Sequence, residues 1–263
     1  MEQCIINPSR GRGEPCLPPF GILAVNPSDT GHLQALAGRF RLQRHFLFHS
    51  RLYAGPDLFI AGPAVGAPMA VICLEKLIAL GARSILVHGW CGSLVPELAA
   101  TDILVPTVGL PEEGTSPHYD ERPRPGPDPG LAEELWAWLE ASGRHCRRGP
   151  IWTTDAPFRE TREKVEQYAR DGILAVDMEY TALCTVAGFR SIRLAAAMLV
   201  SDELWRVPWK PVYGHKRFRA LSGQLLELLV GFIRESGARG QVPGDRGQGA
   251  GDRFQGPGDR GLV

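Results

Sequence analysis

The sequence predicts a single α/β domain, built as a layered α/β sandwich. The chain has 263 residues, of which 44% are hydrophobic, so it is long enough to bury one substantial core. Short apolar runs alternate with segments of helical period, an order typical of layered α/β domains. Runs such as 194–200 are continuously apolar, as expected of strands in the interior of a sheet.

The strands and helices are predicted from apolar runs, and their ends from the glycines and prolines that follow or precede these runs. The run 21–26 comes directly after a Pro-rich stretch and is the first predicted strand. The segment 67–80 carries apolar residues at helical spacing and ends before Gly81, so it is predicted to be a helix. The predicted strands are 21–26, 57–62, 84–89, 103–108, 149–153, 173–178 and 192–200, and the predicted helices lie near 31–39, 67–80, 130–142, 159–170, 178–187 and 215–235.

The two ends of the chain differ from this domain in composition. Residues 1–19 are rich in Pro, Gly and Arg and show no period, which predicts a flexible segment before a domain spanning 20–236. From Gly237 onward Gly, Arg, Asp and Gln dominate, and Gly-Asp-Arg recurs at seven-residue spacing. Such a composition offers too little apolar surface to order itself, so 237–263 is predicted to be a disordered tail.

Charge and cysteine content restrict the partners and the compartment. Lys plus Arg equals Asp plus Glu at 29 each, which gives no indication of nucleic acid or an acidic membrane surface, so we expect a small molecule or another subunit. No apolar run approaches the length of a membrane span and the first residues do not resemble a secretory signal, so we expect a cytoplasmic protein. The six cysteines form no Cys-x-x-Cys pair and have no His at zinc spacing, which predicts free thiols and no metal site.

The segment 173–202 gives the strongest indication of chemistry. Asp177 and Glu179 follow one apolar run, and Asp202 follows the next. Acids just beyond interior strands lie where a sheet edge opens into a cleft, so we expect these carboxylates to face a site. The alternatives are local: Glu179 as an acid favoured by the dipole of a following helix, and Asp202 as the N-cap of a segment starting at Glu203.

Two glycine-flanked turns are predicted at the same edge of the sheet. Strand 57–62 runs into 62–68, where glycines and a helix N-terminus suit an anion, although a tight strand-to-helix turn needs glycine in any case. The segment 87–93 is predicted to be a second turn, and the two together would define a pocket. Within it, a packed thiol is favoured over a nucleophile for Cys91, and a structural role over a catalytic base for His88.

Two further segments combine polar and aromatic groups. The Pro-rich stretch 111–129 is a long loop, and we expect it to border the site. The run 152–159 puts polar groups and an aromatic ring directly after a strand. Pro157 and Phe158 there would suit a wall against which a flat ring stacks, or would simply be buried packing.

In this order, the motifs resemble those of the nucleoside phosphorylase and nucleosidase superfamily, which contains uridine phosphorylase, hexameric purine nucleoside phosphorylase and the methylthioadenosine nucleosidases. The resemblance covers about residues 20 to 235, and it implies a three-layer α/β/α sandwich with a mixed central sheet. The motifs that carry it are 62–68 before a helix with Leu-Glu-Lys-Leu, Gly89 to Ser93, Glu113-Gly-Thr-Ser, Val176-Asp-Met-Glu179 and Val200-Ser-Asp202.

The resemblance implies roles for the sugar and base half of a site. Met178 would pack beneath the ribose and Glu179 would hold the ribose hydroxyls, while Asp177 supports them. Cleavage of a nucleoside passes through an oxocarbenium-like sugar, so a carboxylate at the hydroxyls binds the transition state better than the ground state. Asp202 would be the general acid that protonates the leaving base, and the base-binding residues would be Pro157, Phe158 and Ser201.

The nucleophile half departs from the family pattern. Family phosphorylases usually bind phosphate with two arginines, and in our alignment His32 and Val87 take those positions, which removes bidentate anion ligands. The nucleosidase Glu is missing as well, and the nearest carboxylate is Asp29, which would activate water or cap helix 31–39. Arg51 aligns, in an uncertain register, with an arginine contributed by a neighbouring subunit. The candidates on the phosphate or nucleophile side are Ser28, His32, Arg51, Gly66 and Trp90, of which Trp90 replaces a small hydroxyl residue.

The expected activity is cleavage of the N-glycosidic bond of a ribonucleoside by inorganic phosphate, giving free base and ribose 1-phosphate, with no cofactor. A purine is favoured, since the Gln and Arg pair of pyrimidine-specific relatives is not located before Val176. Two alternatives stay open: a nucleosidase that uses water, and a catalytically inactive nucleoside-binding protein. The resemblance also implies a homo-oligomer, as a dimer or a hexamer of dimers.

Overall fold

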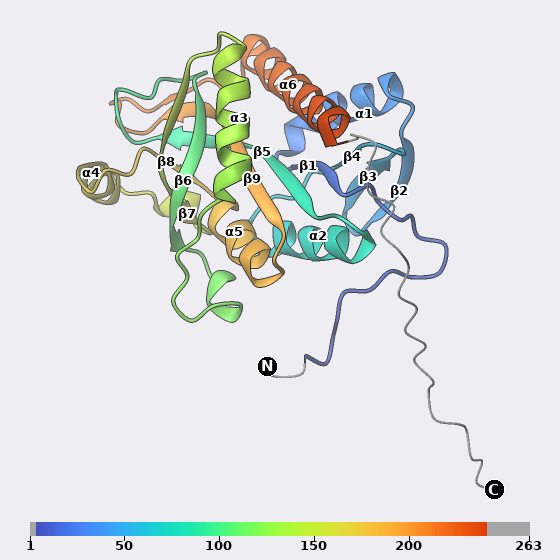
Figure 1. Ribbon diagram of the computed structural model, residues 1–263. Coiled ribbons are helices and arrows are strands. Elements are labelled where there is room, and N and C mark those ends of the chain that lie inside the picture. Colours follow the sequence, from blue (N-terminus) through green and yellow to red (C-terminus); the bar gives the residue numbers. More distant parts are fainter. Residues whose placement is uncertain (1–3, 241–263) are drawn as a thin grey trace, which may run out of the picture.

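The fold is known from a computed structural model that describes residues 4–240 (Figure 1). At its centre lies a ten-stranded sheet with the order β10-β9-β6-β7-β8-β5-β1-β4-β3-β2, in which parallel and antiparallel pairs are mixed. The strands are β1 (Phe20–Ala24), β2 (Gln43–Leu47), β3 (Ser50–Ala54), β4 (Phe59–Gly62), β5 (Ser84–Ser93), β6 (Ile103–Glu112), β7 (Cys146–Thr154), β8 (Ala175–Asp177), β9 (Arg193–Glu203) and β10 (Lys210–Pro211).

Helices cover both faces of this sheet. The helices α2 (Ala67–Leu80) and α5 (Tyr180–Phe189) lie on one face, and α1 (Thr30–Arg39), α3 (Pro129–Ala141) and α6 (Lys216–Gly240) lie on the other, while α4 (Arg162–Arg170) lies beyond the end of the sheet (Figure 1). Alternate residues of the buried strands feed two cores. In β1, Leu23 packs in the core with α2 and α5, and Ile22 packs in the core with α1, α3 and α6. The predicted three-layer sandwich with a mixed sheet is therefore confirmed.

One half of the sheet closes on itself, which the sequence did not predict. β9 pairs with β6 and also with β5, so that β5, β8, β7, β6 and β9 form a ring. β5 and β9 are parallel and stay paired from Ser84 opposite Arg193 to Ser93 opposite Glu203. The two strands therefore run past their predicted ends at 89 and 200, and the predicted turn at 87–93 is wrong.

Close packing explains the glycines of this segment. A Cβ at Gly89 would lie 2.4 Å from Sδ of Met198 on the neighbouring strand, a distance that real side chains do not reach. Gly89 is thus required by the approach of β9 to β5. It does not mark a turn.

The sequence also missed the hairpin of β2 and β3 and the short strand β10. β2 is the outer strand of the sheet and exposes most of its residues, so it has no apolar face that a period of two would reveal. β10 has only two residues and pairs with the end of β9.

The segments at the two ends also make described contacts. Leu17 is buried and donates its backbone N–H to Leu80 O at 2.8 Å, while Lys76 of α2 donates to Ser9 O and forms an ion pair with Glu14. Helix α6 continues to Gly240, past the predicted end at 235. Residues 1–3 and 241–263, including most of the predicted tail, lie outside the described residues.

Two further predictions concern membranes and cysteines. Over the described residues, no helix has both the length and the apolar character needed to span a bilayer. All six cysteines are free, as predicted. The cytoplasmic location stays a prediction.

Candidate active site

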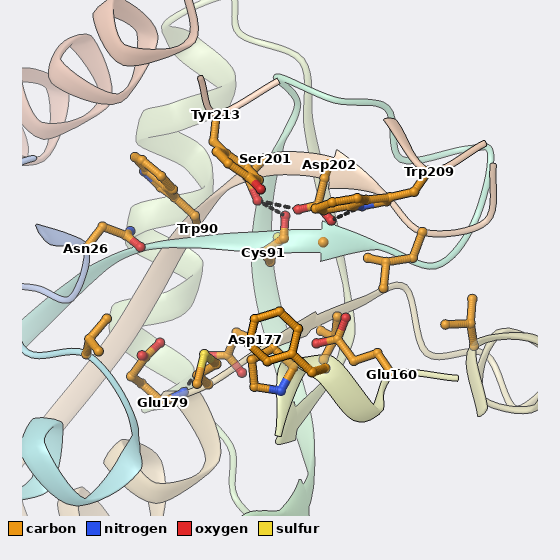
Figure 2. A pocket seen from close by; sticks show the side chains of 18 of the residues that line it. Asn26, Trp90, Cys91, Glu160, Asp177, Glu179, Ser201, Asp202, Trp209 and Tyr213 are labelled. Atoms are coloured by element: carbon orange, nitrogen blue, oxygen red, sulfur yellow. Dashed lines mark hydrogen bonds between the residues drawn. The ribbon is translucent and has the colours of Figure 1, made fainter. Parts of the chain in front are cut away.

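A cavity of about 760 Å³ opens where β5, β8 and β9 end, beside the 3₁₀ turn Pro157–Arg159. It lies at the edge of the sheet where the sequence predicts a site, and most of the predicted residues line it (Figure 2). Those residues are Ser28, Trp90, Pro157, Phe158, Met178, Glu179, Ser201 and Asp202. His32, Arg51 and Gly66 do not line it.

Asp202 lies at the end of β9 and is held by two donors. Ser201 Oγ donates to Asp202 Oδ1 at 2.6 Å, and Trp209 Nε1 donates to Asp202 Oδ2 at 2.8 Å (Figure 2). β9 continues through Glu203 and pairs there with β10, so no helix begins at this point. The alternative of a helix N-cap for Asp202 is therefore wrong, and its carboxylate is fixed in orientation at the cavity wall.

Asp177 and Glu179 have different roles at the start of α5: the first caps the helix and the second faces the cavity. Asp177 Oδ2 accepts the backbone N–H groups of Glu179 and Tyr180, and Oδ1 accepts from Thr153 Oγ1 at 2.6 Å, so Asp177 caps the helix. Glu179 makes no side-chain capping bond, although it stands at the N-cap position. The helix starts at Tyr180, two residues later than predicted, which leaves Met178 and Glu179 in front of it at the cavity.

The carboxylate of Glu179 is buried, and its Oε1 accepts the backbone N–H of Gly66 at 2.6 Å. Burial, and next the charge of Asp177, raise the pKa of Glu179 to about 8, and burial raises the pKa of Asp177 to about 6. A carboxyl group with such a pKa lies close to the balance between its neutral and charged forms at neutral pH. It can therefore respond to charge that develops on a bound ligand.

Gly66 was predicted to serve an anion, but its amide already has a partner. Its φ of +81° belongs to the region that favours glycine, and this conformation places Gly66 at the N-cap of α2. The N–H that would bind phosphate donates to Glu179 instead. The positive end of the helix thus supports a carboxylate of the protein itself.

The other end of the cavity is lined by Asn26, Ser28, Val65 and Trp90. Of these four residues, Trp90 is anchored to the protein interior. Trp90 Nε1 donates to Ser222 Oγ at 2.9 Å, and its ring packs edge-to-face on Phe218. This end therefore presents an aromatic ring to the cavity where relatives were expected to present a small hydroxyl group.

Beneath Trp90 lies a buried polar cluster. Ser222 Oγ donates to Asp29 Oδ1 at 2.8 Å, and Asp29 Oδ2 lies 3.5 Å from Nδ1 of the fully buried His88. Burial lowers the pKa of His88 and outweighs the opposing effect of Asp29. Asp29 does not line the cavity, so it is not placed to activate water there. It stands at the N-cap position of α1, as one of the two alternatives expected, but its side chain makes no capping hydrogen bond.

Neither of the two cationic candidates reaches the cavity. His32 lies on α1 against α6, so close that a Cβ at Gly223 would be 2.5 Å from its Nδ1. Arg51 lies on β3, opposite Gly62 of β4. Among the described residues that line the cavity, the only cation is Arg162, whose guanidinium donates to the backbone oxygens of Leu204, Trp205 and Arg206.

Several lining residues were missed by the sequence reasoning, among them Asn26, Glu160, Arg162, Trp209 and Tyr213. Trp209 and Tyr213 follow β9 in a segment without strong periodicity, so only the tertiary fold brings them over the site. Glu160 was assigned to a helix from 159, whereas α4 starts at Arg162 after the cap Thr161. The Thr-x-x-Lys spacing at 161–164 was the available signal for that start, because Thr161 accepts the N–H of Lys164.

Burial raises the pKa of the Cys91 thiol well above its usual value. This thiol is therefore protonated and packed, as favoured from the sequence.

The loop 111–129 does not border the cavity, although the sequence predicted that it would. Its Glu113 accepts from Thr181 Oγ1 of α5 and from two backbone N–H groups of the loop itself, which ties the loop to α5. No group of three or more His, Cys, Asp or Glu side chains within residues 4–240 has the arrangement of a metal site.

The sequence pattern of the Phosphorylase superfamily matches residues 19–217, which is most of the chain. The chain belongs to this superfamily. The resemblance drawn from the ordered motifs is therefore confirmed, and the matched range contains every residue named above as lining the cavity.

Curated relatives within the superfamily include phosphorylases of purine nucleosides. The chain is 29% identical over 189 residues to guanosine phosphorylase of Halorubrum lacusprofundi, an alignment that covers 69% of this chain and 78% of the relative. It is 27% identical over 167 residues to a DeoD-type purine nucleoside phosphorylase of Bacillus cereus, covering 62% and 70% of the two chains.

Solved structures share the fold at lower identity. Purine nucleoside phosphorylase from Toxoplasma gondii, solved in complex with immucillin-H, has a TM-score of 0.74 and 19% identity, covering 91% of this chain and 99% of the other. AMP nucleosidase from Bacteroides thetaiotaomicron has a TM-score of 0.66 and 22% identity, covering 84% and 90%. Both likenesses confirm the fold class.

Proposed function

We propose that this protein cleaves the N-glycosidic bond of a purine ribonucleoside, with inorganic phosphate as co-substrate and with no cofactor. The observation that carries the proposal is the placement of Glu179 and Asp202 in one cavity, which Met178 and Phe158 also line. Membership of the superfamily and the purine-specific names of the curated relatives support the same activity.

Each carboxylate has a task in the bond cleavage. Glu179 would accept the ribose hydroxyls and stabilise the positive charge that builds up on the sugar. As the C1′–N9 bond breaks, its electron pair goes to the purine, and Asp202 would donate a proton to the leaving base. Ser201 and Trp209 hold the Asp202 carboxylate in one orientation, which limits the reorganisation that this transfer needs.

Phosphate would then attack C1′ from the end of the cavity formed by Asn26, Ser28 and Trp90. A second candidate function is hydrolysis, with water as the nucleophile. It is favoured by one observation, namely that no Lys, Arg or His among the described residues lines that end. A multiply charged anion needs such partners, whereas water does not.

A neighbouring copy of the chain could supply the missing charge, and we include a homo-oligomer in the proposal. On the β2–β3 hairpin, Phe46 and Phe48 are 70% and 41% exposed and pack edge-to-face on each other, an apolar pair of the kind that subunit contacts cover. Arg51 of the same hairpin has a buried Nη1 with no hydrogen-bond partner among the described residues. Light scattering coupled to gel filtration measures the state, and a monomer at all concentrations would contradict this part.

The activity is tested by incubating the protein with a panel of purine and pyrimidine nucleosides, with and without phosphate. Free base, ribose and ribose 1-phosphate are assayed separately. Phosphate-dependent release of base with ribose 1-phosphate is the expected result. Release of base and free ribose without phosphate would establish hydrolysis, and the absence of any product would leave a nucleoside-binding protein.

A further inference from the structure

Glu160 is a carboxylate at the cavity to which neither the proposed chemistry nor the family motifs assign a role. It lies between the 3₁₀ turn Pro157–Arg159 and the cap of α4, two residues beyond Phe158. In Figure 2 it lies across the cavity from Asp202 and Trp209, on the same side as the 3₁₀ turn. A ring stacked on Phe158 and contacting Asp202 would therefore bring another of its edges to Glu160.

The carboxylate of Glu160 has no partner within the part of the chain that the structure describes. No hydrogen bond or ion pair to it is formed by the residues that the structure describes, and the nearby Arg162 donates to backbone oxygens instead. Burial, and next the charge of Asp202, raise the pKa of Glu160 to about 7. A partly buried carboxylate without a partner costs free energy in the empty protein, and a ligand that donates hydrogen bonds to it would recover that cost.

We infer that Glu160 is a specificity-determining residue that accepts hydrogen bonds from the N1–H and 2-amino group of a guanine-type base. The inference rests on the proposed function, since it assigns the purine to this cavity. A carboxylate offers two acceptor oxygens side by side, and guanine presents two parallel donors on the edge that carries N1 and the 2-amino group.

Other purines match this carboxylate less well. Hypoxanthine keeps the N1–H donor but lacks the 2-amino group, so it would make one of the two bonds. Adenine has an acceptor at N1, which faces the lone pairs of an ionised carboxylate and is repelled. A site built around a hydrogen bond discriminates strongly against a ligand that leaves a polar group unpaired. The expected order of preference is therefore guanosine, inosine, adenosine.

The test compares Glu160→Gln with the wild-type protein on these three nucleosides. Gln keeps the shape of the side chain but replaces one acceptor with an N–H donor, so it can pair with the N1 acceptor and 6-amino donor of adenine. The ratio of kcat/KM for guanosine to that for adenosine is expected to fall by roughly 10- to 100-fold, mostly through KM. Glu166→Gln, an exposed glutamate on the helix that follows and outside the cavity lining, is the matched control and should leave the ratio unchanged.

Binding provides a readout that does not depend on turnover. Dissociation constants for guanosine and adenosine, measured by calorimetry without phosphate, should change in the same direction as the kinetic ratio. An unchanged ratio in both measurements would overturn the inference. A fall in kcat that is equal for all three purines would also overturn it, because that result would make Glu160 a group of the common chemistry.

The two proposals fail in different ways. If the wild-type protein cleaves no nucleoside but binds guanosine better than adenosine through Glu160, the proposed activity fails and the inference stands. If it cleaves purines with a preference that Glu160→Gln does not alter, the activity stands and the inference fails.

Discussion

The two ends of the cavity differ in how they use ionisable groups. At one end Asp177, Glu179, Asp202 and Glu160 all line the cavity, and burial raises the pKa of the first two and of Glu160. At the other end the ionisable groups, Asp29 and His88, are enclosed behind Trp90, where Ser222 donates to Asp29 and the Asp29 carboxylate lies 3.5 Å from the His88 ring. The ionisable groups of the first end face the cavity, whereas those of the second are buried behind its wall.

This difference predicts opposite effects of substitutions at the two ends on catalysis and on stability. Substitutions at the carboxylate end should alter catalysis more than stability, or even increase stability. Substitutions in the cluster behind Trp90 should do the reverse. The following three predictions run from the largest expected effect to the smallest.

The largest effect is expected for Asp202→Asn. Asn retains one acceptor oxygen and the shape of the side chain, but it cannot donate a proton to the leaving base, so kcat should fall by about 10²- to 10⁴-fold. The melting temperature should stay close to that of the wild-type protein. Asp171→Asn, at the exposed C-cap of α4, is the matched control. Unchanged kcat/KM for purine nucleosides would remove Asp202 from the role of acid.

The second prediction concerns Glu179→Gln, which should separate activity from stability. Gln can still accept the N–H of Gly66 but cannot carry the charge that stabilises the sugar, so we expect kcat/KM to fall by roughly 10- to 100-fold. The same change should stabilise the empty protein at neutral and alkaline pH, because it removes a buried carboxylate that is costly to ionise.

The sign of the pH dependence follows from the pKa of Glu179, which is raised in the folded state to about 8. An unfolded chain releases this proton near the ordinary glutamate pKa, so the wild-type protein loses stability as the pH rises from about 4.5 to 8. The amide side chain of the Glu179→Gln variant does not titrate. The stability difference between variant and wild type should therefore grow over this range, to the order of 1–3 kcal/mol, as measured by urea unfolding at several pH values. A difference that does not depend on pH would contradict the burial argument.

The smallest effect on catalysis is expected for Ser222→Ala, in the cluster behind Trp90. The change leaves Trp90 Nε1 without an acceptor and Asp29 without a donor, which should cost about 1–3 kcal/mol of unfolding free energy. Nucleoside kcat/KM should change by less than about threefold, because neither group contacts the sugar or the base in the proposed site. Ser236→Ala, on the same helix and without a described hydrogen bond, is the control. A large loss of activity with unchanged stability would show that the buried cluster of Ser222, Asp29 and His88 takes part in the chemistry.

Much of the site could be predicted because its residues are attached to strong local signals. The run 194–200 is apolar on both faces of a strand, which places Asp202 at the sheet edge, and the order of the family motifs places Met178 and Glu179 beside it. The predicted roles of His32 and Arg51 rested on alignment alone, and that of Gly66 rested on the glycines and the helix N-terminus of 62–68. In the described chain, the first two side chains do not reach the cavity and the amide of the third is used by Glu179.

The residues that were missed lie in segments where local pattern carries little information. Trp209 follows the end of β9 and contacts Asp202 only because the chain turns back there to form β10. Glu160 lies in an irregular link between a 3₁₀ turn and a helix, so its position depends on where α4 is capped.

The sequence by itself determined the layered α/β class, most of the buried elements and the carboxylates at their ends, because hydrophobic periodicity and side-chain chemistry are local properties. Only the tertiary structure decided that β5 and β9 pair and close half of the sheet into a ring, since strand pairing depends on contacts between residues about 110 positions apart in the chain, such as Ser84 and Arg193. The tertiary structure also decided which polar groups have hydrogen-bond partners inside the protein. Gly66 donates to Glu179 and Ser222 donates to Asp29, whereas within residues 4–240 the Glu160 carboxylate at the cavity has no hydrogen-bond partner.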